Sequence, residues 1–276
     1  MSTSDRPARR PTAAATGRLP WQLLLPSFLA VALLALPVVG LLVRAPWSTL
    51  AQQVRDPEVL QALRLSLLTA STSTVVCLVL GTPLAWLLAR STLPGRRALR
   101  TLVTVPLVLP PVVGGVALLT VFGRTGIVGG WVYEASGYRL PFTTAGVVVA
   151  QTFVAMPFLV LAVEGALRSA DPRFDDVAAT FGASRWQTFS RVTLPLALPG
   201  ILSGAILAWA RALGEFGATI TFNGSFPGTT RTMPSAVYNA LNTDFDAAIL
   251  LSLILLVVSV AILALLRERW LIGAVS

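Results

Sequence analysis

Long apolar segments separated by short polar ones follow one another along most of this chain. Each reaches about 20 residues, the length that a helix needs to cross a hydrocarbon core of roughly 30 Å. The pattern predicts membrane spans over residues 21–43, 59–89, 101–122, 144–165, 196–220 and 244–266. Of the 276 residues, 55% are hydrophobic and only 12% are charged. We therefore predict an all-α, polytopic helical membrane protein with about six transmembrane helices.

Both ends of the chain are predicted to lie outside the spans. Residues 1–20 are rich in Ala, Thr, Pro and Arg without a hydrophobic period, which is typical of a disordered tail. The apolar run from Trp21 resembles the core of a signal peptide, but it is long for one and lacks a clear small-x-small cleavage site before Arg44. We therefore predict a retained first span. Residues 267–276 are predicted to form a short C-terminal tail.

The distribution of arginine, which supplies every basic residue, predicts the topology. The formal net charge of +9 would by itself also suit a nucleic-acid-binding protein. If the N-terminus lies inside, more than twice as many arginines fall in the cytoplasmic segments as at the outer face, which is the positive-inside bias. We predict a multi-pass protein of the cell membrane, with both termini and residues 165–200 in the cytoplasm and no nucleic-acid partner.

Two residue types are absent from the chain, and their absence excludes several functions. Without lysine there is no P-loop lysine and no Schiff-base lysine. Without histidine there are no H-E-x-x-H metal sites and no Ser–His catalytic pairs. Cys77 is the single cysteine and lies in an apolar span, which is typical of a small buried residue. We predict no enzyme activity, no cofactor and no metal, so ATP hydrolysis for uphill transport would belong to another polypeptide.

The polar segment over residues 165–200 predicts two short helices joined at a glycine. Asp171 is placed to cap the first helix, with Pro172 at its first position. Gly182 is suited to the left-handed conformation that ends a helix. Ser184 and Gln187 form a capping box for the second helix. Along one face of the first helix, an apolar stripe is predicted at Phe174, Val177, Ala178 and Phe181, which have helical spacing.

The same segment carries a motif. Asp176-Val177-Ala178, Gly182 and Val192-Thr193-Leu194-Pro195 are similar to the pattern E-A-A, three residues, Gly, nine residues, I-x-L-P. In permeases of ABC importers this pattern marks the loop that docks on the ATPase. Asp replaces Glu and Val replaces Ala here, but the spacing is kept. The resemblance implies ATPase-coupling residues at Phe174, Asp175, Asp176, Ala178, Gly182, Ala183, Ser184 and Arg185.

The resemblance also implies a domain organisation. It covers roughly residues 60–266 and implies the type I ABC importer permease fold. The permease core would occupy 59–266, with its cytoplasmic coupling loop at 166–195. The hydropathy pattern, outside this resemblance, predicts a first transmembrane helix and outer loop over 21–58.

Helix breakers and charges mark three further places in the spans. Pro106, Pro110-Pro111 and Gly114-Gly115 in the third span predict either a flexible, pathway-lining segment or close helix packing. Glu164 and Arg168 are spaced as a surface helix pair. Arg211 and Glu215 lie one turn apart in the fifth span. Either Arg211 attracts an anion while Glu215 orients the Arg211 guanidinium, or the two form a structural ion pair or snorkel to the outer interface.

Residues 211–238 are similar to molybdate importer permeases in their G-E-F-G-A core, the Asn/Gly-rich turn, and the P-G-x-T, T-x-P and A-V-Y elements. Sulfate permeases share R-A-x-G-E but tend to Tyr and Ser-Val after it, so Phe216 and Ala218 favour molybdate. Tungstate permeases look alike. The resemblance implies pathway residues at Arg211, Gly214, Glu215, Thr219 and Asn223. Independently, residues 222–234 predict a turn-rich outer loop whose exposed amides and hydroxyls receive an oxyanion or a binding protein, or simply face solvent.

These features favour the permease subunit of an ATP-driven molybdate importer. The partners implied are a second permease copy in a homodimer, a pair of ABC ATPase subunits on the cytoplasmic face and an external molybdate-binding protein. Alternatives are a permease for sulfate, thiosulfate or tungstate, and an uncoupled anion channel. An intramembrane enzyme is disfavoured because carboxylates at membrane depth are sparse.

Overall fold

The structure, a computed structural model, describes residues 21–171 and 173–273, with side chains as far as residue 265. The predicted tail over 1–20 and Pro172 lie outside the described residues. Every regular element in the described ranges is helical, which confirms the all-α class. Within these described ranges, five helices are long and apolar enough to cross a membrane, and α4 with α5 makes a sixth span if the bent pair counts as one.

The helices have the following bounds. The first group comprises α1 (Trp21–Arg44), α2 (Leu50–Arg55), α3 (Pro57–Arg90), α4 (Arg96–Val108), α5 (Pro111–Phe122), α6 (Gly129–Ser136) and α7 (Thr144–Ser169). The second comprises α8 (Arg173–Thr180), α9 (Arg185–Thr188), α10 (Leu194–Leu213), α11 (Gly217–Asn223), α12 (Met233–Leu241) and α13 (Phe245–Gly273). A short 3-10 turn, η1 (Trp47–Thr49), precedes α2, and a π-helical segment, η2 (Phe189–Thr193), joins α9 to α10.

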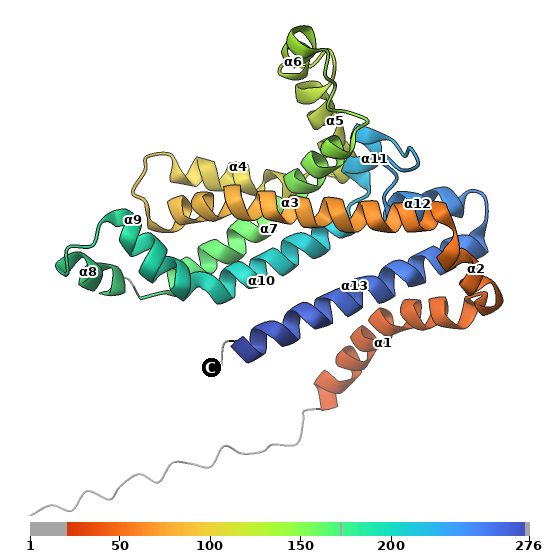
Figure 1. Cartoon of the computed structure of the whole chain (residues 1–276). Helices are drawn as coiled ribbons and strands as arrows, with labels where there is room; N and C mark the ends of the chain where they lie inside the picture. Colours follow the sequence, from red (N-terminus) through yellow and green to blue (C-terminus); the bar gives the residue numbers. More distant parts are fainter. Residues whose placement is uncertain (1–20, 172, 274–276) are drawn as a thin grey trace, which may run out of the picture. The chain divides into compact units, whose positions relative to one another are not determined.

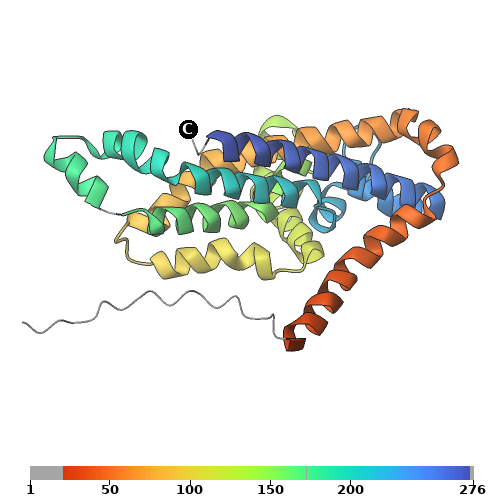
Figure 2. The same cartoon turned by 90° about the horizontal axis from the view of Figure 1, so that it is seen from below.

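The described residues divide into two compact units, one up to Ala45 and the other from Pro46 onward. In the first unit, α1 is apolar along its whole length and none of its side chains is buried. In the second unit, α3, α7 and α10 lie side by side and α13 runs alongside them (Figures 1 and 2). Small residues let these helices approach closely, as at Gly204, where an added Cβ would lie 3.1 Å from Ala162 Cβ.

The predicted third span is broken rather than continuous. The axes of α4 and α5 meet at an angle of 118°, at a break that holds Leu109 and Pro110. Leu109 is extended, as expected for a residue before proline, and Pro110 and Pro111 have no N–H to continue the helix. A Cβ added at Gly115 would lie 2.6 Å from Thr221 Cβ on α11, so the close-packing alternative explains this glycine.

The fifth span is also shorter than expected. We predicted a helix over 196–220, but α10 ends at Leu213 and a separate short helix, α11, follows after Gly214. α11 packs against α5 and α7, so the chain changes direction inside the predicted span. The hydropathy pattern did not separate these two helices, because no proline lies between them.

Glu164 and Arg168 form the expected ion pair, but the prediction that this pair lies on the surface is wrong. Arg168 Nη2 does lie 2.9 Å from Glu164 Oε1, but Glu164 is only 4% exposed. The same oxygen accepts a hydrogen bond from Arg100 on α4. Two arginines therefore compensate one buried carboxylate and attach α4 to α7, which makes the pair part of the packing between helices.

The last helix runs further than the hydropathy pattern indicated. α13 continues through residues 267–273, which we assigned to a C-terminal tail. The cytoplasmic location of that end stays a prediction.

Candidate functional site

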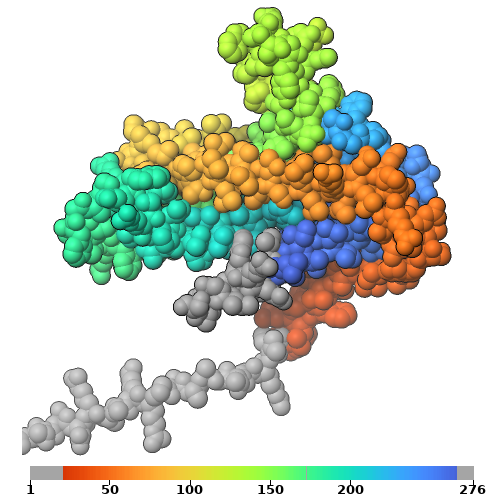
Figure 3. Space-filling view, in the orientation of Figure 1, coloured from red at the N-terminus to blue at the C-terminus, as the bar shows by residue number. Residues whose placement is uncertain are grey.

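The predicted coupling loop projects from one end of the second unit. α8 and α9 extend beyond the ends of α3 and α7 and the start of α10 (Figures 1 and 3). Asp171 Oδ1 accepts a hydrogen bond from the backbone N–H of Arg173 at 2.9 Å, so the aspartate caps α8 as predicted.

The junction between the two short helices follows the local sequence signals closely. Gly182 has a φ of 75°, in the left-handed region, and its N–H donates to the Ala179 carbonyl at 3.0 Å. Ser184 Oγ accepts from the Gln187 N–H at 3.3 Å, and Gln187 Oε1 accepts from the Ser184 N–H at 2.8 Å. This reciprocal pair is the predicted capping box. The loop is therefore held in one defined shape by its own residues.

Large apolar side chains on this loop are exposed. Phe181 is 87% exposed and Trp186 is 71% exposed, and Phe174 and Val177 also face outward. They share the loop with exposed charged residues such as Asp176 and Arg185. Exposed apolar side chains rimmed by charge are typical of a protein-docking surface.

The predicted coupling residues do not all face outward. Asp176, Gly182, Ser184 and Arg185 are exposed, whereas Ala178 and Ala183 are half-buried. Asp175 points back to the helix bundle, where its Oδ1 accepts a hydrogen bond from Thr193 Oγ1 at 2.9 Å. The motif could not reveal this difference, because adjacent residues on a helix point in different directions.

A second group of predicted residues surrounds the break between α10 and α11. Arg211 Nη1 lies 2.5 Å from Glu215 Oε2, so the expected ion pair is present. Glu215 is 1% exposed, and its Oε1 accepts a hydrogen bond from the Ala218 N–H at 2.8 Å. The carboxylate therefore stabilises the start of α11 and holds the Arg211 guanidinium in place. The side chain of Arg211 is 27% exposed. Arg211 is thus oriented by Glu215 and still reachable.

Thr219 and Asn223 lie on the same face of α11 and are fully buried. No hydrogen-bond partner is found for Thr219 Oγ1 or for either polar atom of the Asn223 amide. Asn223 packs directly against Gly146 on α7, where an added Cβ would collide with the amide oxygen. Gly214, by contrast, is exposed. The five predicted pathway residues therefore divide into a reachable pair, Arg211 and Gly214, and three buried ones.

The outer loop over 222–234 is less exposed than its composition suggested. Asn223, Thr230 and Thr232 are buried, and Thr230 Oγ1 accepts from the Phe226 N–H at 2.9 Å. Thr229 remains exposed, with its carbonyl accepting from Thr144 Oγ1. Three of the loop's polar side chains are therefore withdrawn from solvent, and Thr230 holds the loop together.

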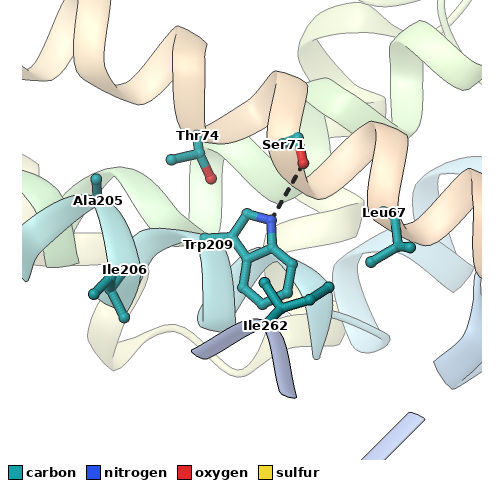
Figure 4. A pocket seen from close by; sticks show the side chains of 7 residues that line it. All are labelled: Leu67, Ser71, Thr74, Ala205, Ile206, Trp209 and Ile262. Carbon is teal, nitrogen blue, oxygen red and sulfur yellow. Dashed lines mark hydrogen bonds between the residues drawn. The ribbon is translucent and has the colours of Figure 1, made fainter. Parts of the chain in front are cut away.

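A hollow of about 360 Å³ between α3, α10 and α13 does not suit an oxyanion (Figure 4). Trp209 Nε1 donates to Ser71 Oγ across it at 3.3 Å. Apart from Ser71 and Thr74 the side chains that line it are apolar. A dianion there would lose its hydration without enough donors to replace it. Among the described residues, no three acidic, histidine or cysteine side chains come together as metal ligands.

Long apolar helices packed in a bundle, with a capped helical loop projecting from one end, define a multi-pass membrane permease. The model for the inner membrane component of binding-protein-dependent transport systems matches residues 81–272, and the chain belongs to this family. It is 48% identical over 255 residues to the molybdenum transport system permease protein ModB of Mycobacterium bovis, covering 92% of this chain and 96% of that relative.

Two further likenesses agree with this family. The chain is 43% identical over 216 residues to the ModB permease of Escherichia coli K12, covering 78% of this chain and 94% of that one. A bacterial ABC transporter involved in alginate import has a chain with a TM-score of 0.75 and 20% identity, covering 91% of this chain and 94% of its own. The latter confirms the fold, that of a type I ABC importer permease.

Proposed function

We propose that this chain is the permease subunit of an ATP-driven molybdate importer and that two copies of it form the pathway. An ATPase subunit docks on the α8–α9 loop of each copy, and an external binding protein delivers the anion. The two relatives at 48% and 43% identity, both molybdenum transport permeases, support molybdate as the substrate. Both termini lie in the cytoplasm under this proposal, as the arginine distribution favours.

The observation that carries the proposal is the α8–α9 loop. It is capped at Asp171 and Ser184, turned at Gly182, and exposes Phe181 and Trp186. A passive channel needs no rigid apolar loop on its cytoplasmic side. A transporter driven by a separate ATPase does need one, because closure of the ATPase dimer has to move the membrane helices.

Arg211 is the side chain that we assign to the anion within the pathway. It is a charged group in a span, it remains reachable, and Glu215 fixes its direction. Thr219 and Asn223 are buried in this conformation, so they meet the anion only if α11 moves away from α7. Such a movement would also satisfy the polar atoms of Asn223 that have no partner here.

Reconstitution tests this function. The permease is placed in liposomes with its ATPase and binding protein, and ATP hydrolysis is measured with molybdate, tungstate or sulfate outside. We expect molybdate to stimulate hydrolysis and to accumulate inside, with sulfate at least about tenfold less effective, a difference of roughly 1.4 kcal/mol. Stronger stimulation by sulfate would contradict the substrate, and anion flux without ATP would contradict the importer.

A further inference from the structure

Arg90, in the last turn of α3, lies where four elements of the loop end meet. Its Nη2 donates to the carbonyl of Ala170, the residue that follows α7, at 3.1 Å. Its Nη1 lies 3.8 Å from Asp175 Oδ2 on α8. The other oxygen of Asp175 accepts from Thr193 Oγ1, directly before α10 begins. One guanidinium and one carboxylate therefore join α3, α7, α8 and α10.

These groups are shielded from solvent more than an ordinary surface ion pair. The side chains of Arg90 and Asp175 are 18% and 29% exposed, and Thr193 is buried. Screening by water is correspondingly weaker than for an exposed pair. The three residues also line a hollow of about 780 Å³ between the end of α3 and the α8–α9 loop. The hollow leaves room for the loop to shift relative to α3.

If α8 moves, the covalent chain by itself does not transmit that movement to α3. The loop is continuous with α7 at its start and, through α9 and η2, with α10 at its end. α3 lies far away in sequence, so its response to the loop depends on side chains. Trp86 on α3 also packs edge-on against Phe189, with ring centroids 5.9 Å apart. This contact keeps α3 in place if Arg90 is replaced.

We propose that Arg90, Asp175 and Thr193 form a coupling junction that transmits movement of the α8–α9 loop to α3, α7 and α10. Asp175 is then a positioning residue inside the permease and not a contact to the ATPase. The inference rests on the proposed function, because it requires an ATPase that moves the loop. Asp176, the exposed neighbour, is the aspartate that faces the partner.

The junction is tested in the full complex with ATPase and binding protein in liposomes. Arg90→Ala, Asp175→Ala and the double variant are compared for ATPase co-purification and for molybdate imported per ATP hydrolysed. We expect co-purification at the wild-type level and import per ATP lowered about tenfold, within the range of coupling between linked sites. Because the two residues share the Arg90–Asp175 contact, the loss in the double variant should be smaller than the sum of the two single losses.

Matched variants separate coupling from general damage. Thr193→Ser keeps the hydroxyl and should import normally, whereas Thr193→Val keeps the shape without the donor and should import less per ATP. Arg97→Ala removes an exposed arginine from the start of α4 at the same end and should have no effect. Loss of co-purification in Asp175→Ala, or additive losses in the double variant, would overturn the junction. Wild-type uptake of molybdate driven by ATP would still stand in that case and preserve the proposed function.

Discussion

Replacing Gly182 with valine is expected to abolish ATPase association and molybdate uptake while the permease still inserts into the membrane. Gly182 has a φ of 75°, a conformation that is a genuine outlier for a β-branched residue. The cost is on the order of 1–3 kcal/mol, which shifts the local equilibrium of the loop away from this turn by a factor of about 5 to 150. Proline should be at least as damaging, because its φ is fixed near −65° and it removes the N–H that donates to Ala179.

The graded series at Gly182 gives the controls. No atom lies within 4 Å of an added Cβ, so the penalty comes from the backbone and not from a clash. Asparagine tolerates the left-handed region and should retain most activity, and alanine should be intermediate. Association is measured by co-purification of the ATPase, and insertion by the amount of permease in the membrane fraction. Equal activity of the asparagine and valine variants would contradict a role for this turn.

Replacing Glu215 with alanine is expected to destabilise the protein by about 3–5 kcal/mol, the usual cost of leaving one partner of a buried pair alone. Arg211 would keep its charge in the span, and the Ala218 N–H would lose its acceptor. The measurement is thermal unfolding in detergent. Glu58→Ala is the matched control, because Glu58 pairs with Arg231 at 2.9 Å but is itself exposed, so its loss should cost about 0–1 kcal/mol.

A paired substitution separates structure from transport at this site. Replacing Arg211 and Glu215 together with methionine removes both charges at similar volume, so much of the stability should return. Uptake should nevertheless stay at least about tenfold below wild type, because the anion then has no cation to meet in the span. Normal uptake by the stable double variant would show that the pair is only structural.

Features set by neighbouring residues were predictable from the sequence. The Asp171 cap, the turn at Gly182 and the capping box at Ser184 each depend on residues within three positions. The ion pair of Arg211 and Glu215 was also predictable, because residues four positions apart are neighbours on a helix. Length and hydropathy predicted the spans formed by α1, α3, α7 and α13, and the spacing of the loop motif predicted the family.

Features set by tertiary packing were not predictable. Glu164 pairs with Arg100, and Asp175 pairs with Arg90, although the partners are more than 60 positions apart in the sequence. The prolines signalled a break in the third span, but the direction of α5 depends on its packing against α11. Similarly, no proline between Leu213 and Gly217 marks the end of α10, and the direction of α11 depends on its contacts with α5 and α7.

The location of the α8–α9 loop on the cytoplasmic side is the claim on which the transport account depends. Cysteine labelling tests it in a Cys77→Ala background, which removes the single native cysteine. Trp186→Cys and Trp131→Cys place one thiol each at exposed positions on α9 and α6. With a membrane-impermeant maleimide, we expect the Trp186→Cys variant to react only in inside-out vesicles and the Trp131→Cys variant only in intact cells. Labelling of the Trp186→Cys variant from outside intact cells would contradict the account.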